Sequence, residues 1–297
     1  MREVLMPTTL NRLWEFLEES PQTAIYAGGT DLLVALRRGS VQADRLICLE
    51  RMAELKGIQV FDEAVRIGAC TTHQELLSHP VMVRRFPLLT KALGVLGSPP
   101  IRHMGTIGGN ICTASPAGDT LPALYLFQGE VEVTSDRQTR RMPIRDFIQG
   151  PGMTALRPKE VVTAIRLPKA PEFNIQHFEK VGQRKALAIS VISLAALVSL
   201  SREGVVEDAR LAWGSVGPTV VTSPEVADAL RGRPLDVESL KNAAPLAEKA
   251  VKPRDDLRAS ARYRRTLAGN LLLRLAIPGK INGSEKRERK QNGNRTA

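Results

Sequence analysis

The stretch YAGGTDLLVALRRG, residues 26–39, decides the first part of the fold. An apolar run stops at two glycines, a threonine and an aspartate, and a helical pattern then begins. Glycines at the end of a strand allow backbone conformations that other residues avoid, and they leave no Cβ to block a ligand. Their N–H groups, together with the N-terminus of the next helix, can face an anion. Taken alone, however, such a stretch favours a plain tight turn.

A second glycine pair occurs in GTIGGNICTASPAGD, residues 105–119. Small hydroxyl or amide residues follow both pairs, and Thr30, Thr106 and Asn110 can supply side-chain donors. A pyrophosphate has two phosphoryl groups, so it needs donors from two sides. Neither loop carries the G-x-G-x-x-G fingerprint or the Walker sequence, and we therefore expect any nucleotide to be held in another way.

The pattern around the first loop predicts a crossover unit. Apolar residues recur at helical spacing over 10–17, and a short strand is expected at 23–27. A helix over 31–38 and a strand at 45–49 follow. Strand, glycine turn, helix and strand in this order predict two parallel strands with a right-handed connection.

Beyond residue 56 the sequence changes to hairpins and short helices. Alternating residues at 57–69 predict a hairpin, whereas 97–119, rich in Gly, Pro and Ser, predicts a long, ordered, irregular segment. The apolar run at 188–200 fits a strand or a helix, and its alternating Ile, Val and Ser favour a strand. Three amphipathic helices are expected near 223–231, 236–250 and 260–277.

The composition is that of a globular protein with a basic surface. Of the 297 residues, 43% are hydrophobic and 25% are charged, and the formal net charge is +11. The last 18 residues hold six Lys or Arg and two Glu without apolar periodicity, so we expect a disordered basic tail over 279–297. Aromatic residues, which stack on bases, make up only 4%, and no recognition motif occurs, so nucleic acid is not an expected partner.

The cysteines and the apolar runs predict a reduced protein without a membrane span. Cys48, Cys70 and Cys112 are odd in number and far apart, and no pair has metal-ligand spacing. Their apolar or glycine-rich surroundings favour buried thiols in the cytoplasm and no iron–sulfur cluster or other metal on this chain. The longest apolar stretch has 13 residues, too few to span a bilayer, and no signal peptide is visible. No nucleophilic triad is visible, so no catalytic residue is expected.

The two glycine loops together carry a specific resemblance. AGGTDLL at 27–33 and IRHMGTIGGNICTASPAGDTLPAL at 101–124 resemble the FAD-binding subunits of the molybdenum hydroxylases, the family of bacterial xanthine dehydrogenases and carbon monoxide dehydrogenases. The likeness covers about residues 4–278, and 217–232 and 258–272 look like the family's C-terminal domain. The resemblance implies an α+β chain. A two-subdomain FAD-binding fold of the PCMH type, like vanillyl-alcohol oxidase, precedes a smaller domain of antiparallel strands and helices.

The resemblance also implies domain boundaries and a function. The FAD-binding domain would cover 1–170, with subdomains at about 1–55 and 56–170, and the C-terminal domain would cover 175–278. The chain would receive electrons from a 2Fe-2S small subunit, which obtains them from a molybdenum-cofactor large subunit, and pass them through FAD to an acceptor such as NAD. Two alternatives stay open, a non-catalytic assembly module of the same fold and a free-standing flavin reductase.

The family's FAD-binding positions can be carried over to this sequence. Residues 25–32 match the first loop and residues 106–110 the second, with the FAD pyrophosphate between them. Asp119 matches an acidic residue near the ribityl chain, and Lys180 matches a basic residue near the flavin end. Two further positions match residues that pack on the cofactor. The implied cofactor-binding residues are Ile25, Tyr26, Ala27, Gly28, Gly29, Thr30, Asp31, Leu32, Leu96, Thr106, Ile107, Gly108, Gly109, Asn110, Asp119, Val162 and Lys180.

Local chemistry leaves alternative roles for some of these residues. Asp119 stands where a helix is expected to begin, so its carboxylate can cap that helix or accept from ribityl hydroxyls. Lys180 near a flavin would stabilise negative charge on the reduced ring, but it also fits a solvated strand lysine. None of the four histidines has a second ligand residue at metal spacing, so a structural role is expected for each, including His73.

Overall fold

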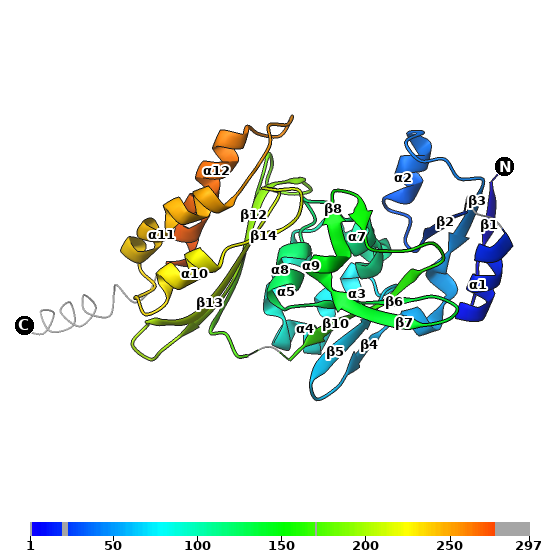
Figure 1. Cartoon of the computed structure of the whole chain (residues 1–297), viewed down its shortest axis with the longest axis horizontal. Coiled ribbons are helices and arrows are strands. Elements are labelled where there is room, and N and C mark those ends of the chain that lie inside the picture. Colours follow the sequence, from blue (N-terminus) through cyan, green and yellow to red (C-terminus); the bar gives the residue numbers. More distant parts are fainter. Residues whose placement is uncertain (1, 20–22, 170, 277–297) are drawn as a thin grey trace, which may run out of the picture.

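Three β-sheets and a small two-stranded ribbon organise the described part of the chain. A computed structural model describes residues 2–19, 23–169 and 171–276, and Figure 1 shows their arrangement. The three sheets follow one another along the chain and along the long axis of the molecule in Figure 1. The basic tail expected over 279–297 lies outside the described residues.

A three-stranded parallel sheet carries the first glycine loop. Its elements are β1 (Glu3–Leu5), α1 (Leu10–Glu19), β2 (Thr23–Tyr26), α2 (Leu32–Arg37) and β3 (Arg45–Cys48). The strand order is β1-β3-β2, and the pairing of β2 with β3 confirms the expected parallel strands. No sequence pattern predicted β1, because this strand has three residues and its central Val4 is half exposed. The glycine loop follows directly at the carboxyl end of β2.

An antiparallel five-stranded sheet and a layer of short helices form the middle of the chain. The strands are β4 (Ile58–Val60), β5 (Ala64–Gly68), β6 (Glu130–Thr134), β7 (Thr139–Pro143) and β10 (Val161–Pro168), in the order β4-β5-β10-β6-β7. The helices are α3 (His73–Ser78), α4 (Pro80–Arg85), α5 (Pro87–Gly94), α6 (Pro99–Met104), α7 (Ile107–Thr113), α8 (Leu121–Leu126) and α9 (Ile144–Phe147), and the ribbon is β8 (Ile148–Gly150) with β9 (Met153–Thr154). The hairpin predicted at 57–69 is confirmed by the pairing of β4 with β5.

The expectation of an irregular segment over 97–119 is wrong, because α6 and α7 form there. Pro99 stands in the first turn of α6, where a missing N–H costs nothing, and the Ser98 side chain accepts from the N–H of Ile101. Thr106 caps α7 by accepting from the N–H of Gly109. Pro and Ser residues, which suggested a loop, therefore begin helix α6, and Thr106 begins α7.

An antiparallel four-stranded sheet, covered on both faces, completes the fold. Its strands are β11 (Ile175–Gly182), β12 (Ser190–Leu200), β13 (Val206–Gly214) and β14 (Val221–Thr222), followed by α10 (Pro224–Leu230), α11 (Val237–Ala250) and α12 (Ala261–Asn270). Figure 1 shows these three helices on one face and α5 and α8 on the other. The three predicted helices are confirmed, and a short 3-10 turn, Leu271–Leu275, follows the last one.

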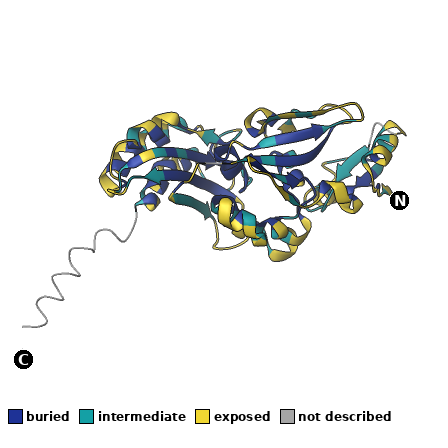
Figure 2. Cartoon of the chain, turned by 90° about the horizontal axis from the view of Figure 1, so that it is seen from below, coloured by how far each residue is buried: buried dark blue, intermediate teal, exposed yellow. Residues whose placement is uncertain are grey.

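Strand β12 confirms the strand predicted at 188–200 and shows why the run is apolar throughout. Leu194 and Ala196 belong to the core under the C-terminal helices, whereas Ala195 and Leu197 belong to the core of the middle part. A strand buried on both faces gives a continuous apolar run, which by periodicity alone resembles a buried helix. Figure 2 shows dark blue strands in the interior of the two larger sheets, whereas the edge strands β4, β7, β11 and β14 have no buried residue.

The middle sheet holds a buried carboxylate between two arginines. Glu132 on β6 is 7% exposed, and its Oε1 lies 2.7 Å from Nη2 of Arg66 on β5. Its Oε2 lies 3.3 Å from Nε of Arg141 on β7. Burial acts to raise the pKa of Glu132, but the hydrogen bonds and charges of the two arginines outweigh it and lower that pKa overall.

We expect Glu132→Gln to lower the free energy of unfolding near pH 7 by about 2 kcal/mol, because two guanidinium groups lose their charged acceptor. The folded-state pKa lies below the ordinary 4.5, so the ion pairs stabilise the protein above that pH and are lost as the pH falls. Urea unfolding near pH 7 and near pH 4 should show a deficit that shrinks in acid. Glu130→Gln on the same strand is the control, and an equal deficit in both variants would contradict the assignment.

Candidate functional site

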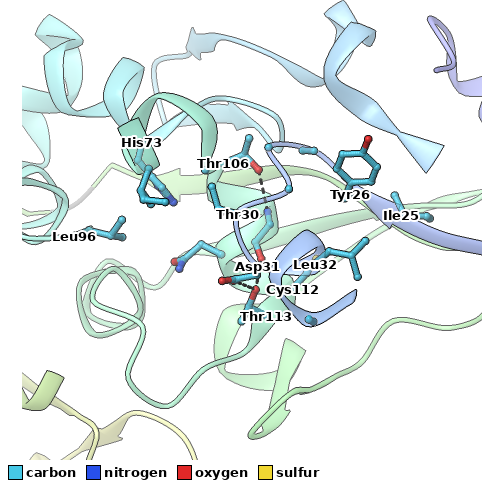
Figure 3. Close-up of a pocket in the computed structure, with 18 of the residues that line it drawn as sticks. Ile25, Tyr26, Thr30, Asp31, Leu32, His73, Leu96, Thr106, Cys112 and Thr113 are labelled. Atoms are coloured by element: carbon cyan, nitrogen blue, oxygen red, sulfur yellow. Dashed lines mark hydrogen bonds between the residues drawn. The ribbon is translucent and has the colours of Figure 1, made fainter. Parts of the chain in front are cut away.

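The two glycine loops line one cavity of about 490 Å³ between the first sheet and the middle helices (Figure 3). This volume falls in the range of cofactor sites. The first loop supplies one wall, and α7 with the residues before it supplies the other. The lining residues are Ile25, Tyr26, Ala27, Gly28, Gly29, Thr30, Asp31, Leu32, Ala35, Val41, His73, Leu96, Ile101, Gly105, Thr106, Gly109, Asn110, Cys112 and Thr113.

Gly28 packs directly against the main chain that precedes the second loop, which leaves no room for a side chain. A Cβ on Gly28 would lie 1.6 Å from the carbonyl oxygen of Met104. At Gly29 the φ angle is +70°, and a Cβ would lie 2.7 Å from Cδ1 of Leu33. The sequence suggested that these glycines make room for a ligand. In the structure they make room for the chain itself and for the turn into α2.

The glycines of the second loop have two different surroundings. A Cβ on Gly108 would lie 2.6 Å from Cβ of Ala69, so this glycine lets α7 pack on the end of β5. Gly109 lines the cavity, and its Cβ would meet only the Thr106 hydroxyl, at 3.1 Å. Gly109 is therefore the glycine of this pair whose missing side chain opens space toward a ligand.

Side-chain hydrogen bonds connect the loops across the cavity floor. The Thr113 hydroxyl lies 2.7 Å from Oδ2 of Asp31 and 2.9 Å from the carbonyl oxygen of Gly109, and it donates to one of them (Figure 3). The side chain of Asp31 makes no capping bond to α2, so its carboxylate serves this contact instead. Thr120 donates to Oδ1 of Asn110, which fixes that amide and leaves its NH₂ group as a donor on the cavity wall.

A buried ion pair lies next to the cavity wall. Lys180 Nζ on β11 donates to Oδ2 of Asp119 at 2.6 Å and to the carbonyl oxygen of Val95 at 3.3 Å, one residue before the lining Leu96. Both charged side chains are less than a tenth exposed. Among the described residues, Asp119 Oδ1 is buried without a hydrogen-bond partner. Burial raises the pKa of Asp119, and Lys180 offsets only part of that rise.

This pair excludes two of the roles that the sequence left open. Asp119 does not cap a helix, because Thr120 is the N-cap of α8 and no side-chain cap bond is made there. Lys180 is not a solvated strand lysine, because its side chain is 9% exposed. The pair joins the C-terminal sheet to the segment that leads into α8.

The structure leaves some of the expected site residues outside the cavity. All of residues 25–32 line it, as do Leu96, Thr106, Gly109 and Asn110. Ile107 and Gly108 are buried beneath the second loop, and Val162 on β10 is 5% exposed and packs in the core of the middle part. The carry-over of these positions stays a prediction.

Several lining residues were not among the expected ones. His73, the first residue of α3, joins the wall because the residue before it, Thr72, pairs with Thr106 in an isolated bridge. Cys112 also lines the cavity, and burial raises the pKa of its thiol to about 12, so it stays protonated. No local sequence signal marks either residue, since both depend on which segments meet in space.

The chain is similar to known proteins over most of its length. Residues 1–170 match the family described as FAD binding domain in molybdopterin dehydrogenase, and residues 177–277 match the CO dehydrogenase flavoprotein C-terminal domain. The xanthine dehydrogenase FAD-binding subunit of Escherichia coli O157:H7 is 31% identical over 259 residues, 86% of this chain and 88% of the relative. The carbon monoxide dehydrogenase medium chain of Afipia carboxidovorans is 32% identical over 249 residues, 84% of this chain and 85% of the relative.

A solved structure has the same fold. It is a carbon monoxide dehydrogenase from Hydrogenophaga pseudoflava that lacks the Mo-pyranopterin moiety of the molybdenum cofactor. The TM-score is 0.85 at 29% sequence identity, over 92% of this chain and 95% of that chain. These matches confirm the expected α+β fold class, with an FAD-binding domain before a C-terminal domain, and FAD as the cofactor.

We expect Gly28→Ala to lower both the melting temperature and the FAD content, because the new Cβ would meet Met104 at 1.6 Å and separate the loops. Overpacking of this kind costs about 1–3 kcal/mol or more. Flavin absorbance per chain after gel filtration and thermal unfolding measure the two effects. Gly94→Ala is the control, because a Cβ there has nothing within 4 Å. Wild-type values for Gly28→Ala would contradict the proposed contact.

We expect Lys180→Met to destabilise the protein near pH 7 by about 3 kcal/mol, because Asp119 is then a buried carboxylate without a counter-charge. The pKa of Asp119 is already raised above the ordinary 3.8 and should rise further. A group with a raised folded-state pKa binds its proton more tightly when folded, so the deficit should shrink as the pH falls toward 5. Urea unfolding at both pH values tests this. Lys185→Met, at an exposed lysine, is the control.

Proposed function

The chain belongs to the family of FAD-binding medium subunits of the molybdopterin dehydrogenases, the xanthine and carbon monoxide dehydrogenase type, and we propose that it passes electrons from an iron–sulfur subunit to an acceptor such as NAD. It is an oxidoreductase subunit of a multi-subunit molybdenum dehydrogenase. Bound FAD supplies the redox chemistry, and this chain binds and orients it. The observation that carries the proposal is that both glycine loops line a single cavity.

The residues around the cavity fit an FAD molecule. Main-chain N–H groups of the first loop and the side chains of Thr30, Thr106 and Asn110 offer donors on two sides, as a pyrophosphate requires. The N–H groups of residues 107–110 already donate within the protein, so the second loop contributes through its side chains. The unpartnered Oδ1 of Asp119 is an acceptor that a ribityl hydroxyl would satisfy. Asp119 and Lys180 stand beside the Val95–Leu96 wall, which supports their assignment to the ribityl and flavin end.

We assign the carried-over positions to three roles. Residues 25–32 and 106–110 surround the pyrophosphate, with Ile107 and Gly108 acting through the packing that holds the loop. Leu96 packs on the cofactor from the cavity wall. Val162 has the weakest support, because its side chain lies in the core behind that wall. Lys180 already neutralises Asp119, so its influence on the flavin is that of an ion pair rather than of a free charge.

The same proposal includes the source of the electrons. The described residues contain no group of three or more His, Cys, Asp or Glu that could hold a metal ion. Electrons therefore have to arrive from a partner, and we propose a 2Fe-2S small subunit beside a molybdenum-cofactor large subunit.

No helix within the described ranges is long and apolar enough to cross a membrane. The three free cysteines support a cytoplasmic location.

We also propose the domain division, with an FAD-binding domain at 1–170 and a C-terminal domain at 175–278. The first comprises subdomains at about 1–55 and 56–170. Separate sheets in each of these segments support the division.

We expect the isolated chain to bind about one FAD and to oxidise no purine or other hydroxylase substrate by itself. Addition of the iron–sulfur and molybdenum subunits from the same cell should give substrate-dependent reduction of NAD or another acceptor. Flavin content and substrate turnover measure the two steps. Failure to bind FAD would favour the assembly module, whereas substrate turnover by the isolated chain would overturn the electron-transfer assignment. NADH oxidation that the partner subunits neither require nor change would favour a free-standing flavin reductase.

A further inference from the structure

His73 is a histidine in the cavity wall that belongs to neither glycine loop. It is 3% exposed and stands at the start of α3, between the two loops. Its main-chain N–H donates to the carbonyl oxygen of Gly105 at 3.0 Å, directly before the second loop. Figure 3 shows its ring beside the cavity, between Leu96 and Thr30 in this view.

The imidazole of His73 has an unused hydrogen-bonding atom. Its Nδ1 is buried and has no partner among the described residues. A buried polar atom without a partner costs about 1–3 kcal/mol, and such atoms are rare in native proteins. Because His73 lines the cavity, a molecule bound there can supply the missing hydrogen-bond partner of Nδ1.

The surroundings hold this ring in place and keep it uncharged. The pKa of His73 is lowered to about 4, chiefly by burial, with the charge of Asp31 acting to raise it and the charge of Arg102 acting to lower it. The ring is therefore neutral at physiological pH, with one nitrogen able to donate and the other able to accept. A capping box of Thr72 and Glu75 fixes the start of the helix. A side chain at position 105 would lie 3.0 Å from the ring, so Gly105 leaves space for it.

We propose that His73 is a further cofactor-binding residue, whose Nδ1–H donates a hydrogen bond to an oxygen of FAD. The inference rests on the proposed placement of FAD in this cavity. His73 lines the same cavity as Thr106, Gly109 and Asn110, so its ring belongs to the wall around the region that we assign to the pyrophosphate. Because the imidazole is neutral, it recognises an oxygen without adding charge beside Asp31. Affinity for FAD should therefore change little between pH 6 and pH 8.

The test compares two substitutions in the full-length apoprotein, His73→Leu and His73→Asn. Leucine removes the hydrogen-bonding atom, and we expect FAD binding to weaken about tenfold, the loss of roughly one good hydrogen bond. The apoprotein should melt at the same or a higher temperature, because an unpartnered buried nitrogen is gone. Asparagine places an amide near the position of Nδ1, and affinity should return to within about threefold of wild type. Titration of flavin fluorescence and thermal unfolding without FAD give these values.

His79→Leu is the matched control. His79 Nδ1 is also buried without a partner among the described residues, but His79 does not line the cavity. That substitution should leave the affinity for FAD unchanged.

Unchanged FAD affinity in His73→Leu would overturn the proposal and leave the FAD-subunit assignment intact. A lower apoprotein melting temperature, with weak binding that asparagine does not restore, would show a packing role and also overturn it. Absence of FAD binding by the wild-type chain would instead overturn the proposed function together with this inference.

Discussion

The close approach of two backbones at Gly28 is the contact on which the site depends. No side chain fits between this residue and the carbonyl of Met104, so at this point the first loop and the end of α6 meet through main chain alone. The contact brings the carboxyl end of β2 against the segment that enters α7. Thr113 then links the second loop to Asp31, and the paired walls enclose the cavity between them.

The second constraint is the attachment of the C-terminal sheet. The face of this sheet that lies against α5 and α8 contributes residues such as Ala195 and Leu197 to the core of the middle part. Hydrophobic contacts of this kind do not depend on direction. The ion pair of Asp119 with Lys180 adds a directional contact to this junction. A buried pair of this kind stabilises little compared with an apolar replacement, because desolvation offsets most of its attraction. Its orphaned oxygen, Asp119 Oδ1, is the acceptor that we propose a ribityl hydroxyl satisfies.

The sequence predicted the elements that have strong local signals and the loops that have unusual composition. Alternating apolar and polar residues predicted the hairpins, and apolar residues at helical spacing predicted the C-terminal helices. The two glycine pairs indicated both walls of the cavity. It failed over 97–119, where Pro99 and Ser98 begin a helix although the same residue types also mark loops. It could not find His73, because a histidine at a helix start acquires a role only from the segment that lies opposite. The apolar run that became β12 was ambiguous for another reason, since by periodicity a strand buried on both faces resembles a buried helix.

The order of these pieces along the chain has a consequence for synthesis. Every residue that lines the cavity lies before position 114, whereas Lys180 and the strands that cover α5 and α8 come more than sixty residues later. On a ribosome, domains emerge and fold from the N-terminus onward. Once residues 1–170 have emerged, the nascent chain therefore contains every residue that lines the cavity, while the face of α5 and α8 toward the C-terminal sheet is still bare and Asp119 still lacks its cation. The C-terminal domain is the last part to be synthesised, and it brings Lys180 to Asp119 beside a cavity whose lining residues are already present.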